Sequence, residues 1–452
     1  MVGFEDAHAL AKAYRTGRAD PIEEAERCLV IAAELPACFI TLTPARARSE
    51  AAAASQRWRR GEPLSALDGI AICWKDFFDI RGTPTTMGTE IYRHATPAKK
   101  DAAIAASARH AGLVTIGKTN LTELAFSGLG LNPHYGTPIN SALEGEPRVP
   151  GGSSSGSAVA VAAGASLLGM ATDTAGSARI PAAFNGLVGF RASTNRLSFQ
   201  GVKPLAPSLD ALGAIARSVR DLASLDDILT ERRIWTDRPK DSTDSLQLVV
   251  DELAIGDAAI APSVRNDFSE AIDRIRRAGI SVTRRPVAVF HAVLDLIGRH
   301  GWLGASEAFA LHEDLLGSAD ADRLDQRVRR RLERAREMDP ADIVALYRAR
   351  PRLMAQMADD LGQAILITPT VAHPAPILAP LQADPELFAA VNLATLRLTM
   401  PGSFLDMPSL SLPIGEGREG NWTGLQLSLP SGRDERLLRA AGTIEAVLRG
   451  PS

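Results

Sequence analysis

A long stretch without any charged side chain, 149–172, constrains the fold of this chain more than any other feature. A helix that spans a membrane needs about 20 mostly apolar residues in a row. This stretch instead opens with Pro150 and the loop 151–157, which contains only glycine and serine. Only the part 158–165 has the composition of an apolar helix. The stretch therefore predicts a glycine-rich loop followed by a short helix that is buried in a soluble protein.

Segments typical of strands alternate with segments typical of helices on both sides of this loop. Alternation of this kind favours an α/β fold with a largely parallel sheet covered by helices. The expected helices are 22–34, 44–60, 99–110, 158–165 and 434–448. The expected strands are 67–74, 113–116, 167–172, 187–190, 246–250, 280–282, 364–367, 409–412 and 425–429.

Length and composition favour one large domain. The chain has 452 residues, of which 45% are apolar, and it contains no low-complexity linker and no internal repeat. A chain of this size can bury a large core. Because helical patterns dominate much of the second half, we expect a single domain over 1–452 with a helical insertion at about 230–360.

A basic segment within this insertion has helical spacing, which is carried by Leu324, Val328, Leu332 and Ala335. The arginines around them are Arg327, Arg329, Arg330, Arg331, Arg334 and Arg336. A basic groove is one interpretation. Acidic residues alternate with these arginines, however, and this pattern favours a solvated helix face.

Bulk charge and cysteine content argue against several classes of partner. The net charge is −3 and the pI is about 6.3, which gives no general attraction to nucleic acid or to an anionic membrane. Three cysteines without C-x-x-C spacing indicate neither a disulfide framework nor a zinc site. Residues 1–20 have no signal-peptide core. We therefore expect a cytoplasmic protein with no nucleic-acid and no membrane partner.

One lysine lies in an apolar segment, which is unusual in a chain that uses mostly arginine. Lys75 is within 70–78, and only seven of the 50 basic residues are lysines. A buried lysine can lose its proton and act as a base, whereas arginine cannot. Lys75 is thus a candidate general base. The alternative is a structural lysine that extends to solvent or pairs with Asp76 or Asp79.

A second turn follows the glycine-rich loop after one short helix and reads Thr172-Asp173-Thr174-Ala175-Gly176-Ser177-Ala178-Arg179. A serine at the end of such a turn can attack a carbonyl carbon while backbone amides bind the oxyanion. Ser177 is the candidate nucleophile, and the amides of Thr174, Ala175, Gly176 and Ser177 are candidate oxyanion donors. Taken alone, a Gly-Ser turn is more often an ordinary helix cap.

Two other motifs compete for the glycine-rich loop. The loop 151–157 lacks the Gly-Lys-Ser/Thr ending of a phosphate-binding P-loop. The segment 152–156 matches G-x-S-x-G, which would make Ser154 the nucleophile of an α/β-hydrolase elbow. The residues before it are typical of a loop and not of the strand that an elbow requires. No histidine pair has the H-x-x-x-H spacing of a metal site.

These motifs together resemble those of the amidase signature family. Its hallmark is a GGSS-rich loop whose first serine is followed 24 residues later by the serine of D-x-x-G-S-x-R, and here 177 − 153 = 24. Similar sequence extends over about 67–219 and resumes at 408–413 and 424–427. The resemblance implies a single large domain, with a twisted mixed sheet between helices and no metal or organic cofactor.

The resemblance also implies a role for each matched residue. Ser177 would attack the amide, Ser153 would relay the proton from an unusual cis peptide with Gly152, and Lys75 would be the base of a Ser-cisSer-Lys triad. An acyl-enzyme would form. The supporting residues would be Ser154, Asp173 and Arg179, and the substrate would contact Phe126, Ser127 and Gly128.

The sequence departs from the family pattern at a few positions and leaves the substrate open. Ser155 interrupts the second glycine pair, Ala175 replaces a glycine, Trp74 replaces a small residue, and Ser403 replaces an asparagine. We expect an amidase for a small carboxamide, with a homodimer as the candidate assembly. The alternatives are a glutaminase-type A subunit of a tRNA-dependent amidotransferase and a catalytically inactive binding protein.

Overall fold

One mixed sheet runs through the computed structural model, which describes residues 4–231, 241–415 and 422–450. Its 11 strands have the order β1-β3-β2-β4-β6-β5-β10-β11-β9-β7-β8. The strands are β1 Phe39–Leu42, β2 Ala71–Lys75, β3 Val114–Thr119, β4 Leu168–Thr172, β5 Val188–Arg191, β6 Leu212–Ala216, β7 Gln247–Asp251, β8 Ser281–Arg285, β9 Ile365–Pro369, β10 Ser409–Ile414 and β11 Thr423–Ser428.

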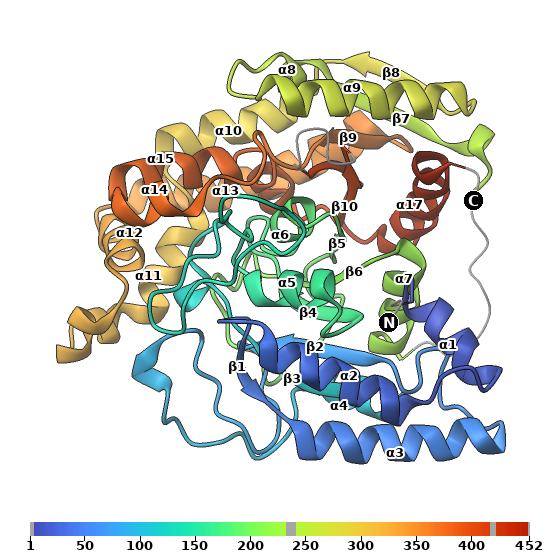
Figure 1. Ribbon diagram of the computed structural model, residues 1–452. Coiled ribbons are helices and arrows are strands. Elements are labelled where there is room, and N and C mark those ends of the chain that lie inside the picture. The colour runs from blue at the N-terminus through green and yellow to red at the C-terminus, as the bar shows by residue number, and fades with distance from the viewer. Residues whose placement is uncertain (1–3, 232–240, 416–421, 451–452) are drawn as a thin grey trace.

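The α-helices lie between and beside these strands (Figure 1). They are α1 Ala7–Arg15, α2 Pro21–Glu34, α3 Pro44–Arg60, α4 Ala103–His110, α5 Ser155–Ala163, α6 Arg179–Phe184, α7 Val219–Leu229, α8 Glu252–Gly256, α9 Pro262–Arg277, α10 Ala288–His300, α11 Leu303–Leu316, α12 Gln326–Arg336, α13 Pro340–Leu361, α14 Leu378–Ala383, α15 Pro385–Leu396, α16 Met400–Phe404 and α17 Asp434–Arg449.

The mixed sheet confirms the fold class, but the expectation of a largely parallel sheet is wrong. Only β2 with β3 and β4, and β7 with β8 and β9, pair in parallel. The other neighbouring strands are antiparallel, because β6 returns between β4 and β5 and because β10 and β11 run side by side in opposite directions. Alternation along the sequence does not specify which strands become neighbours.

Local sequence signals place several helices correctly. Helices α2 and α3 begin at the prolines of Asp20-Pro21 and Thr43-Pro44, and the Asp20 side chain accepts a hydrogen bond from the Ile22 amide. Proline is well suited to the first helical position. Helix α5 begins at Ser155, three residues before the predicted start at 158, so part of the glycine-rich loop is helical. Strands β1 and β6 were not predicted.

Helices cover both faces of the sheet. Apolar side chains of α1, α4, α7, α9 and α17 form the core on one face. On the other face α2, α3 and α5 pack against β2 and β3, and α5 and α6 pack near the centre. In Figure 1, α2 and α3 accompany β1–β3 at one end of the sheet, and α8 and α9 lie with β7 and β8 at the other.

The region 230–360, which the sequence predicted to be a helical insertion, contributes both strands and helices. Strands β7 and β8 extend the sheet at its edge, and helices α10 to α13 follow. The part 232–240 lies outside the described residues. Helices α11 and α12 lie beside α14 and α15 in Figure 1, so this region borders the side of the molecule that holds the site. Of the helices described, none is both long and apolar enough to span a membrane.

Candidate active site

Lys75 is the last residue of β2, and its side chain is completely buried. Alternate residues of a strand share one face, so Lys75 lies on the same side as Ala71 and Cys73, toward α5. Its Nζ donates hydrogen bonds to Ser153 Oγ at 2.8 Å and to Thr172 Oγ1 at 2.6 Å. The strand thus brings the predicted base to the first serine of the glycine-rich loop.

The surroundings of Lys75 favour the neutral amine. Burial disfavours the charged form and lowers the pKa of Lys75 to about 7, although the charges of Asp210 and Asp173 act in the opposite direction. The alternative pairing with Asp76 does not occur. Asp76 instead forms a buried ion pair with Lys118. Lys75 has no carboxylate within ion-pair distance among the described residues, so a neutral amine is accessible near neutral pH.

The glycine-rich loop packs closely against neighbouring backbone. The Gly152–Ser153 peptide bond is cis, as the resemblance implied. A Cβ at Gly152 would lie 2.6 Å from the Gly130 nitrogen, and Gly151 has φ +76°. Only glycine satisfies both positions. The Ser154 amide donates to the Ser177 carbonyl oxygen at 3.3 Å, which joins the loop to the second turn.

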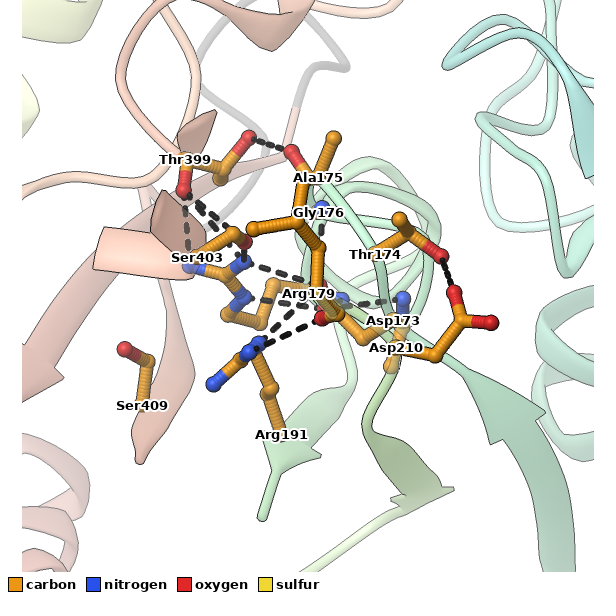
Figure 2. A network of polar contacts seen from close by, with 12 residues as sticks. Asp173, Thr174, Ala175, Gly176, Arg179, Arg191, Asp210, Thr399, Ser403 and Ser409 are labelled. Carbon is orange, nitrogen blue, oxygen red and sulfur yellow. Dashed lines mark hydrogen bonds and ion pairs between the residues drawn. The ribbon is translucent and has the colours of Figure 1, made fainter. Parts of the chain in front are cut away.

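The second turn is organised around the carboxylate of Asp173 (Figure 2). The carboxylate accepts hydrogen bonds from the amides of Gly176 at 2.8 Å and Ala178 at 3.2 Å, and the guanidinium of Arg179 binds both carboxylate oxygens at 2.9 Å. Burial alone would raise the pKa of Asp173, but Arg179 and then Arg191 outweigh it and hold the pKa at about 2. Asp173 is therefore ionised at any physiological pH.

Arg179 also connects the turn to β11 and α16, which come from the C-terminal part of the chain. Its guanidinium donates to Gln426 Oε1 on β11 at 2.7 Å and to Ser403 Oγ on α16 at 2.8 Å. Ser403, which departs from the family pattern, thus retains a hydrogen bond to Arg179. Asp173 and Arg179, for which a supporting role was predicted, are therefore both bonded within and around this turn.

Replacing Arg179 with methionine is expected to lower the free energy of unfolding by about 3–5 kcal/mol, because it removes the cation that binds both oxygens of the buried Asp173 carboxylate and leaves only Arg191, at 3.8 Å, as a counter-charge. The measurement is urea-induced unfolding followed by circular dichroism. Arg48→Met is the matched control, since Arg48 binds Glu26 at 2.6 Å on an exposed surface and such a pair contributes about 1 kcal/mol or less. Equal losses in the two variants would contradict a supporting role for Arg179.

The turn presents three of the four predicted oxyanion donors. Within the described residues, the amides of Thr174, Ala175 and Ser177 have no hydrogen-bond partner. The prediction for Gly176 is wrong, because its amide is already bound by Asp173. The side chain of Thr174 donates to Asp210 at 2.6 Å, and Thr399 Oγ1 donates to the Ala175 carbonyl oxygen. The turn is thus held from both sides while three amides stay available.

Ser177 opens onto a cavity of about 360 Å³. Phe126 and Ser127, two of the three predicted substrate contacts, line it, whereas Gly128 is not among the lining residues and donates its amide to Asn392 Oδ1 at 2.8 Å. Most of the wall is apolar and comes from segments far apart in the chain, including Leu205, Ile297, Trp302, Met338, Leu393, Leu396 and Met400. The cavity is suited to a small organic molecule.

Several residues of the site were not found from the sequence. Thr172 adjoins the second turn, but only the structure shows that it accepts a hydrogen bond from Lys75. Asp210 and Asn392 had no local motif that could have indicated them. The competing elbow interpretation also has no structural support, since Ser154 is fully buried and its Oγ faces the Thr172 carbonyl oxygen at 3.5 Å.

Metal ligands do not gather at this site. In the described part of the chain, no group of three or more histidine, cysteine, aspartate or glutamate side chains is placed to hold a metal ion. The chemistry that these residues can support by themselves is proton transfer and nucleophilic attack by a hydroxyl, with amides that bind a developing negative charge. Hydrolases of acyl compounds form the class that uses such an arrangement.

Comparisons with known proteins agree with this class. A family model described as Amidase matches residues 26–438. The chain is 34% identical to the 2-amino-5-chloromuconic acid deaminase of Comamonas testosteroni, with 91% of this chain and 88% of the relative covered. It is 30% identical to the A subunit of the glutamyl-tRNA(Gln) amidotransferase from Deinococcus radiodurans, with 99% and 98% covered.

A comparison with solved structures also identifies an amidase as a similar protein. A protein described as an amidase superimposes with a TM-score of 0.86 and 31% sequence identity, covering 98% of this chain and all of that one. The chain therefore belongs to the amidase signature family. It is an enzyme that hydrolyses the C–N bond of amides.

Proposed function

We propose that this enzyme hydrolyses a small carboxamide through an acyl-enzyme formed on Ser177, with Ser153 as proton relay and Lys75 as general base. The observation that carries this proposal is the buried Nζ of Lys75, which is bound only to hydroxyl groups and has a pKa of about 7. A neutral amine keeps two N–H groups and gains a lone pair. One N–H can stay on Thr172 while the lone pair faces Ser153.

In this reaction every proton that leaves one group is taken up by another. Ser177 Oγ attacks the carbonyl carbon, its proton passes to Ser153 Oγ, and the proton of Ser153 passes to Lys75. The amides of Thr174, Ala175 and Ser177 bind the oxyanion. On collapse the C–N bond breaks, and the proton returns through Ser153 to the leaving nitrogen. Water then repeats the sequence on the acyl ester and releases the acid.

The proposal is tested directly by a panel of aliphatic, aryl and amino-acid amides with ammonia release as the readout. A fluorophosphonate probe followed by peptide mapping should label Ser177. Absence of both turnover and labelling would favour an inactive binding protein.

Replacing Ser153 with alanine is expected to lower kcat by about 10²- to 10⁴-fold while leaving residual activity, because the relay contributes one general acid–base step. Ser155→Ala is the matched control in the same loop. Ser155 Oγ is buried and has no hydrogen-bond partner within the described residues, so its loss should cost little. If Ser154→Ala were inactive while Ser177→Ala turned over normally, the elbow interpretation would replace this one.

A second candidate function is the glutaminase A subunit of a tRNA-dependent amidotransferase. The match to such a protein over nearly the whole of both chains favours it. Ammonia release from glutamine only in the presence of co-purified subunits would support this candidate. Hydrolysis of other small amides by the isolated chain would support the free-standing amidase.

A further inference from the structure

One arginine of the basic helix α12 lies against the wall of the cavity that holds Ser177. Arg327 binds Asp325 at 2.8 Å, and Arg329 binds both Asp322 and Glu333, so these two side chains pair with acidic residues that alternate with the arginines in the sequence. Arg331 instead turns toward the cavity, where it donates to the Phe126 carbonyl oxygen. Its guanidinium carbon lies 4.4 Å from the centre of the Phe126 ring. Arg331 forms no ion pair with any described residue.

The cavity around Arg331 is cationic. Arg331 and Arg334 both line it, while no aspartate or glutamate is found among its described lining residues. The nearby carboxylate of Asp210 is occupied by Thr174 Oγ1 and by the amides of Leu205 and Ala206. Burial, with a smaller effect of Arg334, lowers the pKa of Arg331 to about 10, but the guanidinium remains charged at neutral pH.

Arg331 is partly buried. A partly buried cation without a counter-charge is unfavourable, so its place in a cavity indicates a negatively charged ligand. Guanidinium has five N–H donors in a planar fork, which matches the two oxygens of a carboxylate. Among the described residues, Arg331 donates only to the backbone of Phe126. The next residue, Ser127, and Ser177 line the same cavity, so the cation and the nucleophile share one space.

We propose that the substrate carries a carboxylate that binds Arg331 while its amide carbonyl lies at Ser177. This inference rests on the proposed function and narrows its substrate class. A cavity with two arginines and no lining carboxylate has nothing to pair with an ammonium group. The substrate is therefore the half-amide of a dicarboxylic acid and not an amino-acid amide such as glutamine.

The experiment compares succinamate, glutaramate and adipamate with neutral amides of the same length in which a methyl group replaces the carboxylate. The wild-type enzyme should have the higher kcat/KM for at least one half-amide. In Arg331→Met the ratio of kcat/KM for that half-amide to its neutral counterpart should fall by about 10- to 100-fold, the effect of a lost charge-assisted hydrogen bond. Glutamine should be a poor substrate in both.

Arg330→Met is the matched control, because it removes the same charge from the same helix at an exposed position that does not line the cavity. Its ratio should stay within about twofold of the wild type. A ratio that falls equally in both variants would reflect the charge of the helix alone and would overturn the inference. So would a wild-type preference for neutral amides, or equal loss on charged and neutral substrates in Arg331→Met.

A second measurement does not depend on turnover. Glutarate or adipate should slow the labelling of Ser177 by a neutral fluorophosphonate in the wild type and in Arg330→Met, but much less in Arg331→Met. If neither glutarate nor adipate slowed the labelling of Ser177 in the wild type, the proposed carboxylate site would be contradicted. The assignment of the nucleophile, and with it the proposed function, would be unaffected. Absence of labelling altogether would instead count against the proposed function, and calorimetric binding of glutarate or adipate to the unlabelled protein would then decide the carboxylate site.

Discussion

Replacing Ser177 with alanine is expected to reduce kcat for amide hydrolysis by about 10⁴-fold or more, because no acyl-enzyme can form without the attacking oxygen. The side chain is small, lies at the cavity wall and is nearly buried, so the variant should fold normally. Ammonia release under single-turnover conditions measures the loss, and the fluorophosphonate label should disappear from the peptide that contains residue 177.

The control for this variant is the thermal unfolding midpoint, which should stay within a few degrees of the wild type. Substrate binding by calorimetry should also persist, because the cavity and the amides of Thr174 and Ala175 are retained. A Ser177→Ala enzyme that still formed a covalent intermediate would contradict the assignment of the nucleophile.

Replacing Lys75 with methionine is expected to lower kcat/KM at neutral pH by several orders of magnitude. The substitution keeps an unbranched side chain as far as the ε position but removes the amine that accepts the proton from Ser153. It also removes the hydrogen bonds to Ser153 and Thr172. Loss of activity with an unchanged far-ultraviolet circular dichroism spectrum would show that the amine acts in catalysis.

The pH dependence of the wild-type enzyme gives an independent check on Lys75. The amine must be neutral to act as a base, and its pKa is lowered by burial to about 7. Below this pH the protonated form prevails, so kcat/KM should fall tenfold per pH unit, and above it the rate should level off. A rate that is independent of pH between 5 and 8 would contradict Lys75 as the base.

Short-range patterns were sufficient to predict several helix starts and to bring the two serine-containing turns forward as the candidate site. Asp20-Pro21 and Thr43-Pro44 mark helix starts because proline suits the first helical turn. The glycines and serines of 151–157 indicated a loop, since glycine is needed where backbones approach closely. The spacing between Ser153 and Ser177 then connected this loop with the second turn. The expectation of a largely parallel sheet was wrong, because strand pairing depends on contacts between distant segments.

Helix α12 contains a residue whose orientation the local sequence does not predict. The alternating charges predicted a solvated face, and the structure shows ion pairs there for Arg327 and Arg329, but nothing in the local sequence distinguishes Arg331 from Arg330. Only the packing of α12 beside Phe126 directs Arg331 toward the cavity. The same holds for Gly176, whose amide was expected to bind an oxyanion and is bound by Asp173 instead.

The amino-acid sequence by itself indicated the residue types of the proposed site, because glycine-rich turns, serines and an isolated lysine are local features that can be recognised without the fold. The tertiary structure alone decided the state of Lys75 and the charge of the cavity. Burial at the end of β2 and contact with two hydroxyls bring the pKa of the amine near neutrality. Desolvation and long-range contact depend on the complete fold, and no short segment contains that information.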